Sequence, residues 1–249
     1  MTTKTTFVCM LALTALVAPA AAQDHHWGYE GDGDPSHWGD LAEEYKECGI
    51  GQEQSPIDIV PANAIQADFR PAEVHWTAFA PAIVDNGHAI QVNTNGKGGY
   101  AELNGVSYEL LQFHFHHKSE HTVDGFHSPL EVHFVHKSEA GDLLVLGVLM
   151  NEGSASAALE AVQSAWPAVG AEVDSEAMLD PANLLPAGTA SFRYQGSLTT
   201  PPCSQTVTWN LYAEPVEISG EQIALFASRY ANNARPVQPL NRRFLLVGN

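Results

Sequence analysis

The fold is decided by residues 110–136, which read LLQFHFHHKSEHTVDGFHSPLEVHFVH and hold seven of the chain's 12 histidines. Two stretches within it, Gln112–His116 and Glu131–Val135, alternate between polar and apolar residues. Alternation of this kind, rich in phenylalanine and valine, predicts β-strands in which every second side chain lies on the same face. Turn signals at Asp124-Gly125 and Ser128-Pro129 separate the two stretches. We therefore expect two neighbouring antiparallel strands.

This pairing would bring three histidines together. His114 and His116 share one strand face, and an antiparallel partner strand would place His133 beside them. Three neutral imidazoles on a rigid sheet suit Zn²⁺ and leave its fourth tetrahedral position to water, as in catalytic zinc sites. Gln112 and Glu131 lie where their side chains can hold the second ring nitrogens of the ligands. The alternative is a loose, solvated metal-binding tract, but such a tract has no need of a buried phenylalanine face.

Seven motifs along the chain resemble those of the alpha-class carbonic anhydrases. They occur in the family's order and cover nearly the whole chain that follows the first residues. The motifs are HHWGY (25–29), QSPIDI (54–59), NGHAIQV (86–92), QFHFH (112–116), SEHTV (119–123), EVHFVH (131–136) and GSLTTPPC (196–203).

The resemblance implies a fold and a reaction. The fold would be mainly β: a single domain with a large twisted, mostly antiparallel central sheet of about ten strands and short peripheral helices. The enzyme would use one Zn²⁺ per chain to hydrate CO2 reversibly to bicarbonate and a proton, by attack of zinc-bound hydroxide. Small activated esters could react at the same centre as a side activity.

Three further residues receive catalytic roles from the resemblance. Thr199 would orient the hydroxide and donate its own proton to Glu120, because an ionised carboxylate can only accept. This arrangement selects protonated nucleophiles, so anions and deprotonated sulfonamides are the expected inhibitors. His88 would shuttle protons to bulk solvent, since an imidazole with a pKa near 6.5 accepts and releases protons near neutrality.

The resemblance also assigns an apolar pocket for CO2 and a network of proton-carrying waters. Val135 alone has support from strand parity, because it shares the face of His133. The pocket would comprise Val135, Val145, Leu198, Thr200 and Trp209, and the water network Tyr29, Asn86 and Gln91.

Residues 1–22 are typical of a secretory signal peptide. Lys4 supplies the positive charge, residues 7–17 the apolar core, and Ala20 to Ala22 a small-residue cleavage site. The apolar run is too short to span a membrane. We expect a carbonic anhydrase domain over residues 23–249, periplasmic or secreted, without a membrane anchor.

The exported chain would keep two cysteines, Cys48 and Cys203. Two cysteines in an exported protein favour one disulfide, and bacterial-type members of the family usually have a bond at matching positions. Free thiols or bonds to another chain are the alternatives. A new N-terminus at Gln23-Asp24-His25 could hold Cu(II) through its amine and third-position histidine. A docked N-terminal arm, as in the family, is the preferred interpretation of this segment.

Charge and length exclude some partners. The chain has 249 residues, 11 basic and 29 acidic side chains, and a formal charge of −18, which loss of Lys4 would make one unit more negative. Such a charge argues against binding to nucleic acid or to anionic membranes. The length fits one large domain. A homodimer, common among bacterial members, is compatible with the sequence, although no surface patch indicates it.

Three other functions compete with a zinc carbonic anhydrase. One is a non-catalytic binding protein on the same scaffold, which the complete set of His114, His116, His133, Glu120 and Thr199 argues against. The second is a dedicated zinc esterase, for which the sequence offers no special ester pocket. The third is zinc storage, favoured only by the abundance of histidine.

The remaining secondary structure follows from local signals. Prolines make residues 40–85 rich in loops. Ser219 with Gln222 forms a capping box that opens a helix reaching about Tyr230. Strands are expected at residues 88–93, around Val106 and Tyr108, and at 110–118, 130–137, 143–150, 192–194 and 206–212, with a helix at 154–166.

Overall fold

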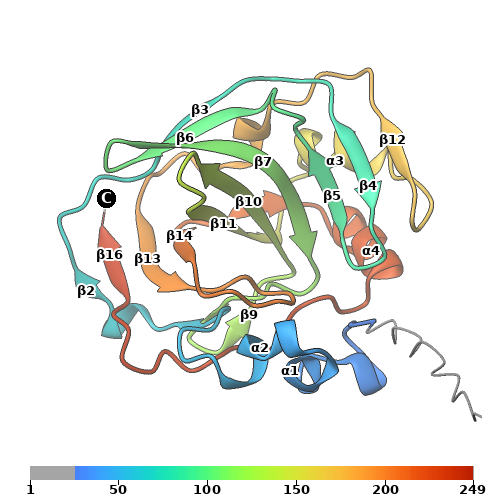
Figure 1. Cartoon of the computed structure of the whole chain (residues 1–249). Coiled ribbons are helices and arrows are strands. Elements are labelled where there is room, and N and C mark those ends of the chain that lie inside the picture. Colours follow the sequence, from blue (N-terminus) through green and yellow to red (C-terminus); the bar gives the residue numbers. More distant parts are fainter. Residues whose placement is uncertain (1–25, 249) are drawn as a thin grey trace, which may run out of the picture.

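A computed structural model describes residues 26–248 of the chain (Figure 1). The predicted signal peptide and the candidate copper site at Gln23-Asp24-His25 lie outside these residues, so both stay predictions. Within the described range, no helix is both long enough and apolar enough to cross a membrane.

Strands dominate the described part of the chain. They are β1 (Asp58–Ile59), β2 (Ile65–Gln66), β3 (Glu73–Trp76), β4 (Ala82–Asp85), β5 (Ile90–Asn93), β6 (Gly99–Leu103), β7 (Val106–His116), β8 (Thr122–Val123), β9 (Phe126–His127), β10 (Leu130–Ser138), β11 (Leu143–Glu152), β12 (Glu172–Asp174), β13 (Ser191–Gly196), β14 (Val207–Tyr212), β15 (Val216–Ile218) and β16 (Leu246–Gly248).

The strands β1, β8 and β9 form a small sheet of their own, and the other 13 strands form one large sheet whose main path has the order β12-β4-β5-β7-β10-β11-β14-β13-β16-β2. Two short arms complete it: β6 pairs with β7 and β3, and β15 pairs with β11. Most neighbours are antiparallel, and the parallel pairs are β11 with β14, β11 with β15, and β16 with β2. The predicted large, mostly antiparallel sheet is confirmed. Its extra strands include two- to four-residue segments in the region expected to be loops.

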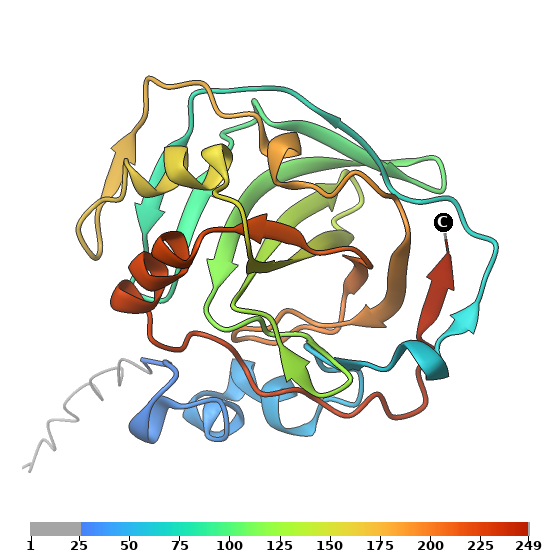
Figure 2. The ribbon, with the colours of Figure 1, turned by 180° about the vertical axis from the view of Figure 1, so that it is seen from behind.

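The helices are short and lie around the sheet (Figures 1 and 2). In both views α3 and α4 are neighbours on one flank, and α1 and α2 lie together below the sheet. The α-helices are α1 (Trp38–Leu41), α2 (Glu47–Ile50), α3 (Ala157–Gln163) and α4 (Gly220–Arg229), and the 3₁₀ turns are η1 (Gly31–Gly33), η2 (Glu43–Tyr45), η3 (Pro61–Asn63) and η4 (Pro181–Leu184).

Local signals predicted most of the central elements. The two expected strands around Val106 and after Leu110 form one strand, β7, and the capping box at Ser219 is present with both of its hydrogen bonds. The strand expected from His88 begins only at Ile90, because Asn86 Oδ1 accepts the backbone N–H groups of His88 and Ala89 and closes a turn there. The predicted 154–166 helix is shorter than expected, as α3.

The central strands are covered on both faces. One face carries Phe113, Phe115 and Phe134, which are fully buried and pack with residues of α3 and α4 in the larger core. The other face carries a second core that includes Val145 and Trp209. Since β7 and β10 place phenylalanine on the first face, their histidines at alternate positions lie on the second.

The predicted disulfide between Cys48 and Cys203 is present and links positions 155 residues apart. Both cysteines pack with buried Trp38, and Trp27 and Tyr29 lie against the same cluster. The bond thus joins the N-terminal segment to the loop that follows β13. The expectation of a docked N-terminal arm is met from His26 onward.

His136 is a fully buried histidine outside the three-histidine cluster. Its Nε2 accepts a hydrogen bond from Trp76 Nε1 at 3.1 Å, and its Nδ1 donates to the carbonyl of Leu144 at 3.2 Å. Burial lowers its pKa from 6.5 to about 4. A proton on Nε2 would oppose the indole donor, so the folded state needs the neutral ring.

We expect this ring to make the protein sensitive to acid. Below pH 6.5 the unfolded chain binds a proton that the folded chain takes up only near pH 4. The free energy of unfolding should therefore fall by about 3 kcal/mol between these values on account of His136 alone. In His136→Gln the amide oxygen can still accept from Trp76, and this part of the loss should disappear. Denaturant unfolding at pH 7 and pH 4 measures the free energy of unfolding of each variant, with exposed His75→Gln as control. An equal fall in this free energy in wild type and His136→Gln would contradict the role of His136 in acid sensitivity.

Candidate metal centre

Three histidine rings converge on one face of the central sheet. The antiparallel register of β7 and β10 sets His133 directly opposite His114, and His116 lies two residues further along the same face. The ring centroids are 5.0 Å apart for His114 and His116, 5.4 Å for His114 and His133, and 4.6 Å for His116 and His133. One nitrogen of each ring lies within 4.8 Å of the others. The rings expected to converge do so.

The second nitrogen of each ring is held by a neighbouring oxygen. His114 Nδ1 lies 2.8 Å from Gln112 Oε1, and His133 Nε2 lies 2.8 Å from Glu131 Oε1. His116 Nδ1 lies 2.8 Å from the backbone carbonyl of Asn233. These oxygens accept, so the held nitrogens carry the protons and the three inward nitrogens keep their lone pairs.

The inward nitrogens fit a metal ion. His116 Nε2 is buried and has no hydrogen-bond partner among the described residues. A buried polar atom without a partner is costly. A cation held between the inward nitrogens of His114, His116 and His133, a space that we call the cup, would satisfy it. Burial lowers the pKa of His114 well below its ordinary value and also lowers that of His116, so both rings are neutral as ligands must be. Three imidazole nitrogens with an open fourth position are the donor set of a catalytic zinc site.

Glu131 serves a second histidine that the sequence did not single out. His121 Nδ1 lies 2.7 Å from Glu131 Oε1, and its Nε2 lies 2.7 Å from the hydroxyl of Tyr194. Burial alone would raise the pKa of Glu131, but His121 and His133 bring it well below its usual value. His121, Glu131 and His133 could in geometry form another metal site. Because both nitrogens of His121 already have partners, this group acts instead as support for His133.

Glu120 lies fully buried beside the cup. Its Oε1 accepts the backbone N–H of Arg235 at 2.9 Å. Its Oε2 faces the free nitrogens, 3.6 Å from His116 Nε2 and 3.8 Å from His133 Nδ1. Oε2 has no hydrogen-bond partner among residues 26–248, so the expected bond from Thr199 is not formed here. Thr199 itself is buried in the loop between β13 and β14.

The side chains expected to form an apolar pocket lie together. Val135 faces Val145 across β10 and β11, and Val145 faces Trp209 across β11 and β14, so the three form one row on one sheet face. The Trp209 ring lies edge-on to His133, with centroids 4.8 Å apart. Leu198 packs against the same cluster. The carbonyl of Thr200 accepts the backbone N–H of Cys203, which tightens the loop beside them.

The residues expected in the proton path lie on β5, in the turn before it and in the N-terminal segment that packs against this turn. His88 is half-buried and stacks on Trp27, with ring centroids 3.8 Å apart. Gln91 faces His114 across β5 and β7, and its amide donates to Asn93. Asn86 has its side-chain oxygen engaged by its own turn, so its role in holding water would fall to the amide NH2 group and stays a prediction.

Three converging imidazoles with their acceptors and a neighbouring apolar row, on a mostly antiparallel sheet, are the features of a candidate catalytic metal centre. Comparisons with known proteins show which family has this arrangement. Residues 33–247 match the family model described as eukaryotic-type carbonic anhydrase. The chain is 40% identical to the carbonic anhydrase of Nostoc sp., over 94% of this chain and 90% of the relative. It is also 40% identical to that of Pectobacterium atrosepticum, over 98% and 99%.

Solved structures agree. An alpha-carbonic anhydrase from Thermovibrio ammonificans, in complex with the inhibitor sulfanilamide, matches with a TM-score of 0.87 and 47% identity over 89% of this chain and 98% of that one. Dioscorin complexed with ascorbate matches with a TM-score of 0.83 and 29% identity, over 89% and 97%. The chain belongs to the alpha-carbonic anhydrase family, and this membership supports carbonic anhydrase activity.

Glu131, which accepts the hydrogen bond from His133, allows a test of whether the three histidines hold a metal. Glu131→Gln keeps the shape of the side chain but removes the charge that orients His133 and His121. We expect zinc affinity to fall roughly 10- to 100-fold, as for other residues that hold metal ligands. Competition against a chromogenic chelator measures this. Exposed Glu139→Gln, in the turn after β10, is the matched control; equal affinity of both variants would contradict the role of Glu131.

Proposed function

We propose that His114, His116 and His133 hold one Zn²⁺ and that the chain catalyses the reversible hydration of CO2 to bicarbonate and a proton. The observation that carries this is the cup itself, in which every outward ring nitrogen is held and the inward ones meet. When bound, Zn²⁺ lowers the pKa of water to about 7 and so supplies hydroxide near neutral pH. Family membership supports the same reaction.

Glu120 and Thr199 would orient the attacking oxygen. Glu120 is fixed by the backbone N–H of Arg235 and offers Oε2 toward the cup. As a carboxylate it can only accept, so a hydroxyl that donates to it leaves its own lone pair for the nucleophile's proton. We assign this hydroxyl to Thr199, whose loop is pinned by the disulfide at Cys203.

The row of Val135, Val145 and Trp209, with Leu198, would take CO2. These side chains present carbon atoms next to His133 and offer few hydrogen bonds to water. Trp209 directs its one donor, Nε1, to the carbonyl of Ser197 at 3.0 Å, away from a substrate. An apolar surface that excludes water favours an apolar molecule beside the nucleophile and disfavours competing water.

His88 would accept the proton that each turnover releases. Its ring is half-buried on Trp27, so it is held near the N-terminal segment and still reaches solvent. Burial, together with nearby His26, lowers its pKa below 6.5. A less basic imidazole releases its proton to buffer more readily, which suits a shuttle.

Inhibitor binding and export have support of their own. The sulfanilamide complex of the Thermovibrio protein supports binding of sulfonamides, and with them of anions, at this centre. The disulfide supports export to the periplasm or beyond, because such bonds persist in oxidising compartments. A homodimer, side activity on small esters and cleavage after residue 22 stay predictions.

One experiment separates the competing functions. Stopped-flow CO2 hydration by the zinc-loaded protein should be fast, should stop after chelation, and should return with added zinc. Turnover of a small activated ester is measured in parallel. Slow hydration beside fast ester cleavage would instead indicate a dedicated esterase, and zinc binding without either activity would indicate storage.

The shuttle has its own test. His88→Ala should lower CO2 turnover in weak buffer by roughly 10- to 100-fold, because the proton must then leave through water alone. Added imidazole should restore much of the rate. His75→Ala, which removes an exposed histidine on β3, serves as control. An unchanged rate, or a loss that imidazole does not rescue, would remove His88 from the proton path.

A further inference from the structure

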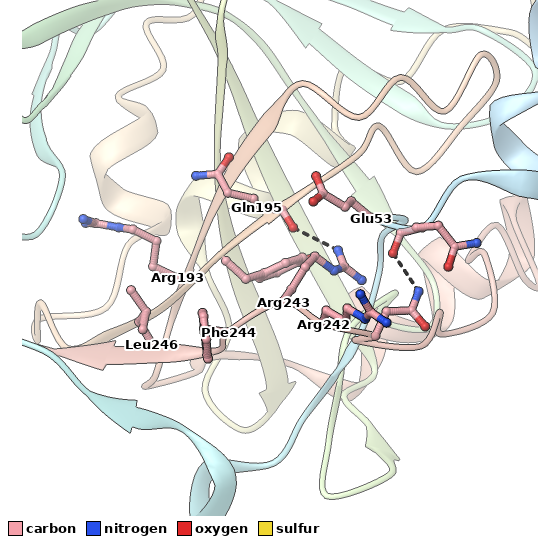
Figure 3. Close-up of a pocket in the computed structure, with 10 residues that line it drawn as sticks. Glu53, Arg193, Gln195, Arg242, Arg243, Phe244 and Leu246 are labelled. Atoms are coloured by element: carbon pink, nitrogen blue, oxygen red, sulfur yellow. Dashed lines mark hydrogen bonds between the residues drawn. The ribbon is translucent and has the colours of Figure 1, made fainter.

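A cavity lies where β16 separates from β13. Leu246 pairs with Arg193, but the residues just before Leu246 leave the sheet and open a space of about 740 Å³ (Figure 3). This volume is in the range of small-molecule sites. None of the proposed zinc ligands, Glu120, Thr199 or His88 lines it, so it is separate from the metal centre.

The cavity is positive in an otherwise acidic protein. Arg193, Arg242 and Arg243 line it with one carboxylate, Glu53, although the whole chain has 11 basic and 29 acidic side chains. In three other surface cavities the acidic side chains outnumber the basic ones. Among residues 26–248 the only ion pair of an arginine joins Arg229 to Asp85, so none of the three cavity arginines is paired with a carboxylate, and Glu53 is the one negative charge that faces them.

Arg243 provides a fixed cation at the cavity wall. Four neutral backbone carbonyls hold its guanidinium at 2.9 to 3.0 Å, those of Gln54, Gln195, Pro239 and Leu240. Burial lowers the pKa of Arg243, and Tyr194 and Glu53 partly oppose this shift. A cation so placed attracts an anion at little conformational cost.

Arg242 supplies the open donors. Its side chain is exposed and makes no hydrogen bond to any described residue, so its planar fork of N–H groups can bind a carboxylate in a bidentate manner. Arg193 contributes charge only, because its guanidinium is held by Asn210 Oδ1 and points away from the other labelled side chains (Figure 3).

An apolar surface lies beside these cations. Phe244 is 68% exposed, and half-buried Leu246 lines the same cavity. A ligand with a flat apolar body would cover the Phe244 ring and remove it from water, which favours binding. The site therefore combines a cationic end with an apolar wall.

We propose that this cavity binds a small aromatic carboxylate. Arg242 and Arg243 take the carboxylate, and Phe244 with Leu246 takes the ring. The charge match selects an anion, since a neutral aromatic leaves the guanidinium groups uncompensated. The apolar wall selects the aromatic body over a small hydrophilic anion.

The test uses benzoate as probe and the mature, zinc-loaded chain. Calorimetric titration is done with and without saturating sulfanilamide, so that binding at the metal is recognised by displacement. We expect a millimolar Kd that sulfanilamide does not change. Benzamide, of equal shape but neutral, and acetate, without the ring, should each bind about tenfold more weakly.

Two variants assign the site. Arg242→Gln should weaken benzoate about tenfold, as expected for loss of a charge-assisted hydrogen bond, and should not disturb the fold because Arg242 holds no other residue. Phe244→Ala should weaken benzoate but not acetate. Lys137→Gln, which removes an exposed cation elsewhere, is the matched control and should bind as wild type. Displacement by sulfanilamide, equal binding of benzamide, or an Arg242→Gln variant that binds as wild type would each overturn the proposal.

Discussion

The alignment of β7 with β10 is the constraint on which the rest of the molecule depends. Because His133 faces His114, the rings meet, and Glu131 reaches both His133 and His121. A slip by one residue would turn every side chain to the opposite face and send the histidines into the phenylalanine core. The buried Phe113 and Phe134, which also face each other in this register, oppose such a slip. Packing on one face thus positions the chemistry on the other.

Much of this arrangement could be predicted from the sequence, for physical reasons. Strand parity alone placed His114 and His116 together with Gln112, and the same parity placed Val135 with His133. The turn signals at Asp124-Gly125 and Ser128-Pro129 located the connection between the two histidine-bearing strands, and the capping box located the start of α4. These signals are local, since they depend on spacings of two to four residues. The disulfide was expected because an exported chain would keep two cysteines, with support from family resemblance, and the apolar row was expected from the resemblance; the structure forms both.

Other parts of the centre could not be predicted because they use groups that any residue can supply. The carbonyl of Asn233 holds His116, and the N–H of Arg235 holds Glu120. Backbone atoms leave no signature in composition or periodicity, and these contacts span more than a hundred residues. The turn that Asn86 closes with its side-chain oxygen was also not predicted, because resemblance pointed only to a role with water. Short strands such as β2 were missed since their pairing, not their sequence, defines them.

The contacts from Asn233 and Arg235 also set an order of events during biosynthesis. Both residues lie near the end of a 249-residue chain, and the Arg235 side chain reaches back to the carbonyls of Cys48 and Ser55. The cup cannot be braced while the C-terminal segment is still inside the ribosome or a translocation channel. The three histidines can therefore take their braced arrangement only after Asn233 and Arg235 have been released, in whichever compartment these residues emerge. Under the proposed function, the zinc supply of that compartment, rather than that at the site of synthesis, would decide how much of the protein is active.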